Sequence, residues 1–420
     1  MPVATPSSKP LVALLLQFML MVAVCLPTGS IFGLNVKIPV FSLFFLAFAF
    51  YLATHSSKWL RSSELIFLGC FSAGLSFWAL IAIFHGQSET TQVFLQLKDL
   101  ASTVLIAWLC IFFVRRGLLQ PQDIIKPVVY GTLALAAMKL LLIAVTIGPH
   151  IDPIQLLSSV FGEDALVGGS MAFGLTRVEF SSDIIGSFAL FVILCPTVSG
   201  IHFGRLTTFC AVAILLASGL LAFARYIWFL EFVAMVAALI VERRLKLLLV
   251  AVVVIAPLTI GYYEALEPLV EARFFSDQVS DSDLIRIEQF KALSDAIKTR
   301  PLIGKGLGTH VHEVIRNQQN KYSYELQWIS LSMQFGLLGI CGILLLIVAS
   351  ARDLFRAHHP AKPWLTALFA LWLLSGWTNP HLTSSFAGAT FGMFMALFYA
   401  IRFHSSPRRD DLANPVKVAT

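Results

Sequence analysis

The sequence predicts an all-α, polytopic integral membrane protein with about 12 transmembrane helices. The 420-residue chain is 57% hydrophobic and only 13% charged, and its mean hydropathy is +0.81. A soluble protein of this size carries about twice that charged fraction. Apolar runs of roughly 17 to 25 residues, the length that crosses a hydrocarbon core as a helix, recur along the chain. A single long polar stretch, residues 264–325, interrupts them.

The apolar runs place twelve spans in order. The first run is interpreted as a helix and not as a signal peptide, because it lacks a small-residue cleavage site and many further spans follow it. The first six predicted spans are 11–28, 38–54, 65–84, 100–114, 125–147 and 183–198. The other six are 204–223, 226–241, 245–263, 326–350, 364–378 and 384–401.

The positive charges of the loops test this count independently, because lysine and arginine gather in cytoplasmic loops. With a cytoplasmic N-terminus, one set of connections is rich in cations: Lys9, Lys58, Arg61, Arg115, Arg116, Lys126, Arg205, Arg243, Arg244, Lys246, Arg352, Arg356 and Lys362. The opposite short loops carry only single cations: Lys37, Lys98, Arg177 and Arg225. An even number of spans with both termini cytoplasmic is therefore expected.

This topology divides the chain into four regions. Residues 1–263 hold the first nine spans with short loops, residues 264–325 form one large loop outside the cytoplasm, residues 326–401 hold the last three spans, and residues 402–420 are a disordered cytoplasmic tail. Because nearly all of the rest is apolar, we expect the large loop to carry the specific chemistry.

The large loop has a predicted internal structure. Asp281 or Ser282 can cap a helix that runs to about Lys298, since apolar residues recur there at three- and four-residue spacing. This helix places Arg286 and Gln289 on a shared flank. Pro301 then ends the helix. The GKGLG segment that follows is expected to form a flexible turn that leads into the polar stretch ending at Tyr324 and Glu325.

Charges at the membrane boundary are candidate functional groups, because an unpaired charge in hydrocarbon costs several kcal/mol. Arg225 lies where two apolar spans meet with almost no loop, and either a site or an interfacial anchor would explain it. Arg177 is a ligand contact or a surface charge. Glu231 is expected to form a structural pair with a cation such as Lys139, and Asp183 to cap a helix.

Other polar groups have weaker interpretations. Asn379 and His381 lie on the outer side between the last two spans, where an ordinary turn around Pro380 is an equal explanation. His310 and His312 do not have the spacing of a helical metal motif, so no metal and no cofactor is predicted. All six cysteines fall in apolar runs, as buried structural residues do. The cations form no stripe that would indicate nucleic-acid binding.

Three segments of the chain resemble the O-antigen ligase and O-antigen polymerase (Wzy-type) superfamily of bacterial membrane glycosyltransferases. FARYIW resembles the arginine junction of that family and carries Arg225. SDLIRIEQFKALSDAIKTRPLIGKGLG resembles its loop helix followed by a P-x-x-G-x-G pattern and carries Arg286. YELQWISLSMQFGLLGI resembles its re-entry into the membrane. At the position of the ligase histidine, eleven residues before Gly336, this chain has Glu325.

The resemblance implies an enzyme of the bacterial inner membrane that transfers or polymerises undecaprenyl-pyrophosphate-linked oligosaccharide repeats at the periplasmic face. Its donor would be the lipid-linked glycan and its acceptor a saccharide hydroxyl, with a chain-length regulator as a further partner to consider. Guanidinium groups bind pyrophosphate well. The implied catalytic residues are Glu325 as base, with Arg286 and Arg225. The alternative for Glu325 is a solvated helix cap or a salt-bridge partner for one of the arginines. The substrate-binding candidates are Arg177, Tyr324, His310, His312 and Asn379.

The missing ligase histidine favours a polymerase of O-antigen, capsule or exopolysaccharide. Ligation of glycan to lipid A-core is the nearest alternative. A transporter or flippase of lipid-linked glycans belongs to another functional class, and twelve spans are common there; the single large outer loop argues against it. A structural subunit of a synthase complex is a third alternative. The sugar, the linkage and the acceptor depend on pocket shape, which a sequence does not give.

Overall fold

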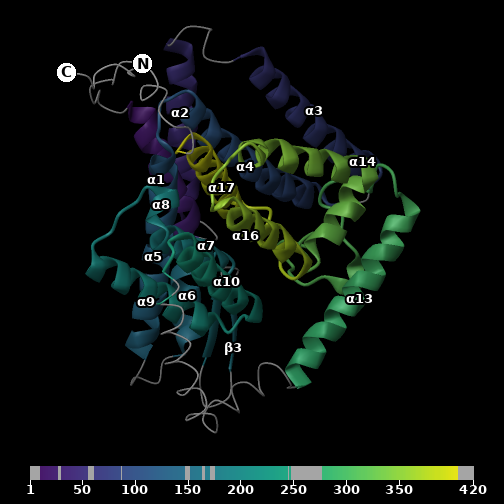
Figure 1. The fold of residues 1–420 in the computed structure, drawn as a ribbon. Helices are drawn as coiled ribbons and strands as arrows, with labels where there is room; N and C mark the ends of the chain where they lie inside the picture. The colour runs from purple at the N-terminus through teal and green to yellow at the C-terminus, as the bar shows by residue number, and fades with distance from the viewer. Residues whose placement is uncertain are drawn as a thin grey trace, which may run out of the picture.

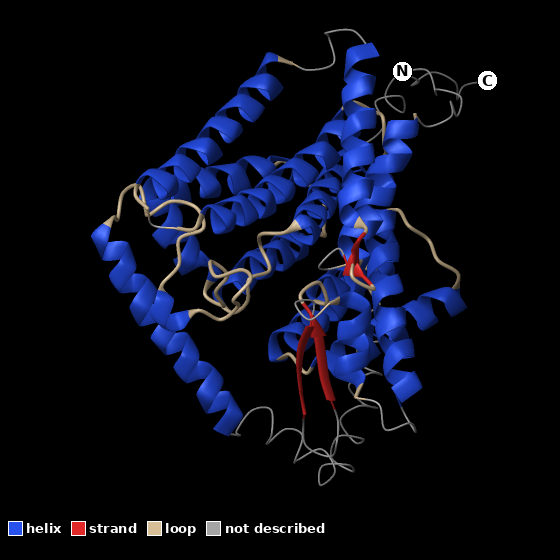
Figure 2. Ribbon diagram, turned by 180° about the vertical axis from the view of Figure 1, so that it is seen from behind, coloured by secondary structure: helices blue, strands red, loops and turns tan. Residues whose placement is uncertain are grey.

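The computed structural model describes residues 10–26, 30–54, 61–86, 88–146, 152–162, 166–170, 176–244, 246 and 277–404. Within these ranges the protein is a bundle of helices with two small antiparallel hairpins (Figures 1 and 2). The helices before the large loop are α1 (Leu11–Cys25), α2 (Lys37–Thr54), α3 (Ser62–Phe84), α4 (Thr90–Arg115), α5 (Pro121–Thr146), α6 (Pro153–Phe161), α7 (Ile184–Leu194), α8 (Pro196–Ser199), α9 (Arg205–Ala222) and α10 (Arg225–Val241).

The large loop contributes α13 (Asp277–Thr299) and the 3-10 turn η3 (His312–Val314). The remaining elements are α14 (Gln327–Ser350), α15 (Arg352–Phe355), α16 (Lys362–Leu374), the 3-10 turn η4 (Ser375–Trp377) and α17 (Ser385–His404). The hairpins pair β1 (Ser30–Ile31) with β2 (Leu34–Asn35), and β3 (Leu166–Ser170) with β4 (Thr176–Phe180).

Seven of the described helices are long and apolar enough to cross a membrane: α2, α3, α4, α5, α9, α14 and α17. The protein is therefore a helical membrane protein. The predicted span 245–263 lies outside the described residues apart from position 246. Four other predicted spans correspond to shorter helices, namely α1, α7, α10 and α16, so the total of twelve spans stays a prediction.

Two predicted boundaries differ for identifiable reasons. The span predicted at 183–198 ends at Leu194, because Pro196 cannot continue α7 and instead begins the short helix α8. The span predicted at 100–114 begins at Thr90, so Lys98 lies on α4 and not in a loop. The polar side chains of this first half of α4 are used by the large loop, as described below.

The core of the bundle lies between α4 and α17, with α1, α5 and α7 around them. Small residues permit the close approach of α17 to α4: a Cβ at Gly388 would overlap the Thr103 carbonyl, and one at Gly392 would overlap the Cys110 side chain. Small residues at helix interfaces are a common device of membrane bundles, because dispersion contacts and not hydrophobic burial hold the helices together there.

The turn after α13 is rigid, and the expectation of a flexible turn at GKGLG was wrong. Gly304, Gly306 and Gly308 all have positive φ angles, of 72°, 94° and 72°. A Cβ at any of the three would overlap neighbouring atoms, including backbone of α14 near Gly336 and of α3 at Ala82. The glycines therefore let the loop backbone pack directly on the membrane helices.

Side chains of α3 and α4 complete this anchor. Trp78 Nε1 donates a hydrogen bond to the Ile303 carbonyl (2.9 Å), and the Lys321 backbone N–H donates to Gln92 Oε1 (3.0 Å). The Tyr322 hydroxyl donates to Asp99 Oδ2 (2.7 Å). Residues 301–325 therefore form a fixed platform over one end of α3, α4 and α14. From this platform α13 extends away from the bundle (Figure 1).

A second feature outside the long helices is built by α6 and the hairpin β3–β4. Leu157 and Phe161 of α6 pack on Val178 and Phe180 of β4 in a separate small apolar cluster. In Figure 1, this hairpin and the Asp277 end of α13 lie toward the bottom of the view, whereas the beginning of α1 lies at the top.

Candidate functional site

The centre of the site is the carboxylate of Glu325, which two arginines hold. Arg286 Nε lies 2.6 Å from Glu325 Oε2, and Arg316 Nη1 forms an ion pair with Glu325 Oε1. Both oxygens are therefore occupied by guanidinium groups. The Glu325 side chain is 11% exposed, whereas those of Arg286 and Arg316 are 29% and 37% exposed. The two arginine side chains are therefore more accessible to solvent than the carboxylate between them.

Arg286 reaches this position because of the face of α13 on which it lies. Gln289, Leu293 and Ala296 share that face and are buried against Tyr324, Leu326 and Met333. This confirms the predicted shared flank of Arg286 and Gln289, although α13 begins at Asp277 and not at Asp281 or Ser282. Asp283, one turn earlier, accepts a second hydrogen bond from Arg286 (2.9 Å).

Glu325 is fixed by the start of α14 and the loop between α16 and α17. Gln327 Nε2 donates to Thr383 Oγ1 (2.6 Å), and its Oε1 accepts from the Leu382 N–H (2.8 Å). The Thr383–Ser384 connection is in turn tied to Thr103 of α4 through the Ser384 N–H (2.8 Å). The carboxylate thus stands at the junction of the large loop with the last two helices.

His381, beside this junction, is a buried histidine with unused hydrogen-bonding capacity. It is 4% exposed, and its Nδ1 is buried without a hydrogen-bond partner in the described part of the chain. Burial is the main cause that lowers the pKa of His381 to about 4; the backbone of Ser181 opposes this effect, and the positive charge of Arg316 adds to it. The imidazole is therefore neutral at physiological pH and lies close enough to Arg316 for their charges to interact.

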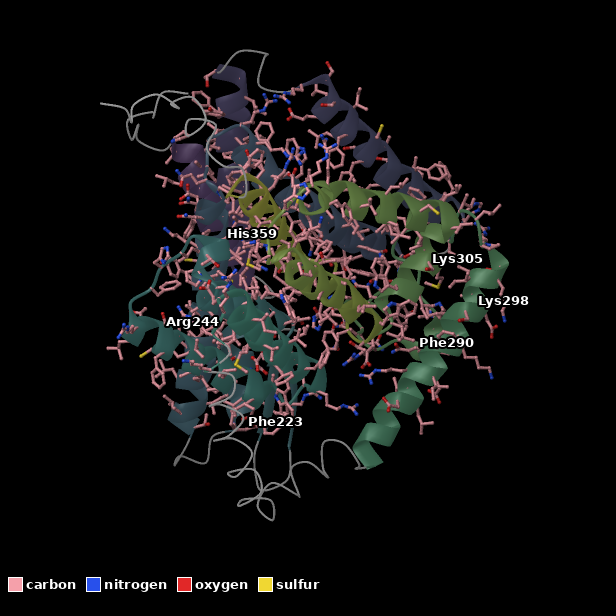
Figure 3. All side chains as sticks on the ribbon, in the orientation of Figure 1. Phe223, Arg244, Phe290, Lys298, Lys305 and His359 are labelled. Atoms are coloured by element: carbon pink, nitrogen blue, oxygen red, sulfur yellow. The ribbon has the colours of Figure 1, made fainter. Side chains whose placement is uncertain are left out.

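Arg225 and Arg177 belong to a second cluster, at the end of α9. Phe223 adopts a left-handed conformation (φ 46°), so α9 turns directly into α10 at Arg225, as the tight junction in the sequence predicts. Arg177 of β4 donates to the Ala222 carbonyl (3.3 Å) and forms an ion pair with Glu179. Figure 3 labels Phe223 at this junction, well separated from Phe290 of α13.

Beneath this second cluster lies a charged pair inside the helix bundle. Lys139 Nζ is fully buried, 2.7 Å from Asp183 Oδ2 and 2.9 Å from the Ser218 carbonyl. The sequence suggested that Lys139 pairs with Glu231 and that Asp183 caps a helix. Both expectations were wrong in detail: Asp183 is the partner of Lys139, and its side chain makes no helix-capping bond. Glu231 is buried nearby and packs on Gly219.

The other predicted substrate-binding residues have local partners. The Tyr324 hydroxyl accepts a hydrogen bond from the Val311 N–H (2.7 Å), and the ring is 1% exposed, so it supports the platform. His310 stacks edge-on against His312 and lies against the Gly308 carbonyl (3.3 Å). Asn379 is half-buried, and its N–H donates to the Ser375 carbonyl (2.9 Å).

Two residues of the central cluster were not singled out as site residues from the sequence. Arg316 stands in a polar stretch with no periodicity, so nothing distinguishes it from a surface cation. His381 is conspicuous only as a polar residue between two apolar helices. In both cases, only the contact with a neighbouring residue identifies the side chain as part of the site. That neighbour becomes adjacent only when the loop folds onto α14.

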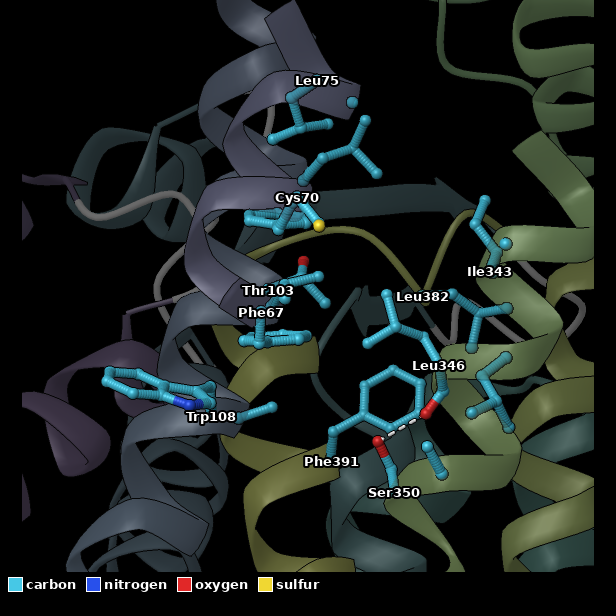
Figure 4. Close-up of a pocket in the computed structure, with 18 of the residues that line it drawn as sticks. Phe67, Cys70, Leu75, Thr103, Trp108, Ile343, Leu346, Ser350, Leu382 and Phe391 are labelled. Atoms are coloured by element: carbon cyan, nitrogen blue, oxygen red, sulfur yellow. Dashed lines mark hydrogen bonds between the residues drawn. The ribbon is translucent and has the colours of Figure 1, made fainter. Parts of the chain in front are cut away.

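An apolar cavity of about 580 Å³ opens beside the cluster (Figure 4). Trp328, Leu382 and Thr383 line its end nearest Glu325, and Ser63, Glu64 and Arg115 line its other end. Side chains of α3, α4, α14 and α17 make its walls, among them Phe67, Leu75, Trp108 and Ile343. The cavity thus lies along the membrane helices, and none of Glu325, Arg286 and Arg316 lines it.

No protein-family model matches the chain, and no curated protein matches it in sequence. Among the described residues, no group of three or more histidine, cysteine, aspartate or glutamate side chains is placed to hold a metal ion. The chemistry that the site supports must therefore be argued from its own residues.

Proposed function

We propose that the protein is a bacterial inner-membrane glycosyltransferase that polymerises oligosaccharide repeats carried on undecaprenyl pyrophosphate at the periplasmic face. The observation that supports this best is the combination of two partly exposed arginines on one carboxylate with an apolar cavity whose lining includes Thr383, the hydrogen-bond partner of Gln327, two residues after that carboxylate. A lipid diphosphate needs both: guanidinium groups for its head and an apolar surface for its chain.

The arginines suit the diphosphate for electrostatic reasons. A guanidinium group can donate two parallel hydrogen bonds to phosphate oxygens and keeps its charge at all physiological pH values. Glu325 holds Arg286 and Arg316 side by side. When the diphosphate binds, its oxygens compete with the carboxylate for the same donors, and the arginines then stabilise the charge that develops as the glycosidic bond to phosphate breaks.

The reaction requires no external energy source. The acceptor hydroxyl attacks the anomeric carbon of the donor sugar, the bond from that carbon to the phosphate oxygen breaks, and undecaprenyl pyrophosphate leaves with the bonding electrons. The hydroxyl proton passes to a base. Glu325 is the candidate base of the sequence-based hypothesis, and it can take this role once the diphosphate has drawn an arginine away from one of its oxygens.

The cavity suits the isoprenoid part of the donor. Its walls are largely aromatic and aliphatic side chains of helices that cross the membrane. An isoprenoid chain seated there would keep the diphosphate at the membrane boundary, next to Glu325. Arg225 and Arg177, at the end of α9, are in this proposal the contacts of a more distant part of the substrate.

Envelope polysaccharide from a deletion strain that carries plasmid-borne variants tests the proposal. Arg286→Ala, Arg316→Ala and Glu325→Ala should each abolish long chains on a gel. Lys298→Ala is the matched control, because Lys298 lies on the same helix, is 76% exposed and pairs with Asp295 of its own helix. Normal long chains in all three site variants would reject the assignment. Loss of polymerisation leaves single repeats on the lipid core, whereas loss of ligation leaves long chains off it.

One observation favours a transporter as a second candidate. Lys139, Asp183 and Glu231 are buried charges among membrane helices, and such residues often mark a substrate or ion pathway. Movement of an undecaprenyl-pyrophosphate-linked glycan across proteoliposome membranes, with no change in glycan length, would favour this candidate over the polymerase.

A further inference from the structure

The end of the apolar cavity away from Glu325 carries a charged cluster that the function described above does not use. Asp353, just after α14, has a side chain that is only 4% exposed, and two arginines hold its carboxylate. Arg115 Nη2 lies 3.0 Å from Asp353 Oδ2, and Arg402 Nη1 forms an ion pair with Asp353 Oδ1. The arrangement repeats that of Glu325 just before α14: one nearly buried carboxylate between two arginines.

Arg115 is the member of this cluster that lines the cavity. Because Arg115 and Arg402 share one carboxylate, the cluster carries one positive charge more than Asp353 neutralises, and the Arg115 side chain is 46% exposed. Glu64 also lines this end of the cavity, but it is paired with Arg116 at 2.6 Å. The cavity therefore ends on an accessible cation.

An isoprenoid chain offers this cation nothing, because it is pure hydrocarbon beyond its diphosphate. A charge that faces hydrocarbon costs several kcal/mol unless it is paired or hydrated. A phosphate is the complementary group, since a guanidinium donates two parallel hydrogen bonds to its oxygens. In the topology that the loop charges predict, Arg115 lies on the cytoplasmic side. The headgroups of anionic phospholipids lie at that level.

The walls of the cavity have the length and the opening that an acyl chain requires. Its lining on α3 runs from Ser63 to Trp78, a rise of about 22 Å, whereas the hydrocarbon of one leaflet is about 15 Å thick. Cys70 and Gly342 line the cavity and are exposed, so it is open from the side of the bundle. Figure 4 shows Cys70 of α3 on one wall and Leu346 of α14 on the other.

We propose that this end of the cavity binds an anionic phospholipid, with its phosphate on Arg115 and one acyl chain along α3 and α14. The acyl chain and the isoprenoid of the donor use the same walls, so the two lipids exclude each other. The phospholipid fills the cavity between turnovers and leaves when the donor enters. This competition rests on the proposed glycosyltransferase function, whereas the phospholipid site does not.

The site is tested by native mass spectrometry of the purified full-length protein with phosphatidylglycerol or phosphatidylcholine of identical acyl chains. Phosphatidylglycerol should bind roughly fivefold more tightly, the scale of one cation beside an anionic headgroup. Arg115→Gln should abolish this preference, while Arg402 still holds Asp353. Arg115→Lys keeps the charge and should keep most of the preference. Arg205→Gln is the control, since Arg205 is exposed at the start of α9 and does not line the cavity.

The competition is tested by the affinity for undecaprenyl pyrophosphate in nanodiscs of phosphatidylcholine with increasing fractions of phosphatidylglycerol. The apparent affinity of the wild-type protein should fall as phosphatidylglycerol replaces phosphatidylcholine. In Arg115→Gln it should stay constant, because that variant no longer distinguishes the two phospholipids.

Equal affinity of the wild-type protein for the two phospholipids, or an unchanged preference in Arg115→Gln, would overturn the phospholipid site. Equal losses in Arg115→Lys and Arg115→Gln would overturn the role of the charge. A preference for phosphatidylglycerol without competition would overturn the shared cavity. Failure of the proposed function looks different: the wild-type protein would then prefer phosphatidylglycerol as expected, but would neither bind undecaprenyl pyrophosphate nor lengthen the glycan.

Discussion

At the scale of single residues, the site depends on what each polar side chain already binds. Glu325 has both oxygens on arginines, and His381 has a buried nitrogen with no partner in the described chain. A carboxylate that accepts charged hydrogen bonds holds its donors in place, whereas a buried imidazole without a partner at one nitrogen favours the neutral form. The two residues therefore have separable roles, which substitutions can distinguish.

Glu325→Gln separates the role of a base from that of an arginine holder. Glutamine keeps one oxygen for a guanidinium but accepts no proton. If Glu325 is the base, we expect Glu325→Gln and Glu325→Ala to lose rate equally, by about 10²- to 10⁴-fold. The measurement is kcat for glycan extension in nanodiscs. A kcat of Glu325→Gln within a few-fold of wild type would contradict the role of Glu325 as a base. Its role in holding the arginines would then remain.

His381 should make the protein sensitive to acid. Its pKa is lowered by burial from the ordinary 6.5 to about 4, so on acidification an unfolded or opened state takes up a proton before the folded state does. The stabilisation is complete above about pH 6.5 and is lost progressively toward pH 4, by about 3 kcal/mol in all. Thermal unfolding in detergent should show a smaller loss between pH 7 and pH 4 in His381→Asn. An identical loss in both proteins would contradict the neutral buried imidazole.

At the scale of elements, the platform of residues 301–325 decides where α13 stands. Its glycines bring the backbone onto α3 and α14, and the inner face of α13 then carries Arg286 to Glu325. The platform is therefore a rigid mount for α13 and its arginine.

Gly304→Ala should destabilise the platform more than Gly86→Ala does. Both glycines have positive φ angles, 72° and 58°, but a Cβ at Gly304 would overlap the Gln334 carbonyl, whereas one at Gly86 meets nothing within 4 Å. The positive φ angle costs each alanine variant about 1 kcal/mol of strain. The additional loss of stability in Gly304→Ala therefore measures the overlap of its Cβ with the Gln334 carbonyl. Thermal unfolding in detergent is the measurement. Equal losses would mean that the backbone yields and that the mount is not rigid.

Sequence patterns predicted these elements unevenly. The length of the apolar run predicted the start of α14 to within one residue: position 326 was predicted, and the helix begins at Gln327. The same pattern extended the last-but-one span to 378, whereas α16 ends at Leu374 and η4 follows. Arg286 and Glu325 were singled out from segments that resemble the ligase and polymerase superfamily, and the structure places the two side chains in an ion pair. The role of Arg316 and the Lys139–Asp183 pair could not be predicted from the sequence, since each depends on which of several charges the fold makes adjacent.

At the scale of the whole molecule, the charged site and the apolar cavity are linked through Gln327, whose side chain bonds to the cavity-lining residues Leu382 and Thr383. α4, α14 and α17 contribute to both: they hold the loop above and line the cavity below. Under the proposed function, the bundle orients a lipid chain so that its diphosphate meets the arginines.

Gly342→Phe should block the cavity. Gly342 lines it, and a Cβ there meets nothing within 4 Å, so the ring can enter without disturbing the helices. We expect the apparent affinity for the lipid-linked donor to fall at least tenfold, while the thermal stability stays unchanged. The reason is that the apolar contacts of one isoprene unit are worth more than about 1.4 kcal/mol. Gly69→Phe is the control, since Gly69 is equally open but lies outside the cavity. Unchanged affinity in Gly342→Phe would place the lipid elsewhere.

The measurement that tests the central claim most directly is the affinity of purified protein in nanodiscs for undecaprenyl pyrophosphate, compared among wild type, Arg286→Gln, Arg316→Gln and Lys298→Gln. Loss of one charged hydrogen bond to phosphate costs about 1.5–3 kcal/mol, so each arginine variant should bind at least tenfold more weakly. Lys298→Gln should bind as wild type does. Equal affinity in all four proteins would contradict the proposed function, because the paired arginines on Glu325 would then have no part in holding a lipid diphosphate.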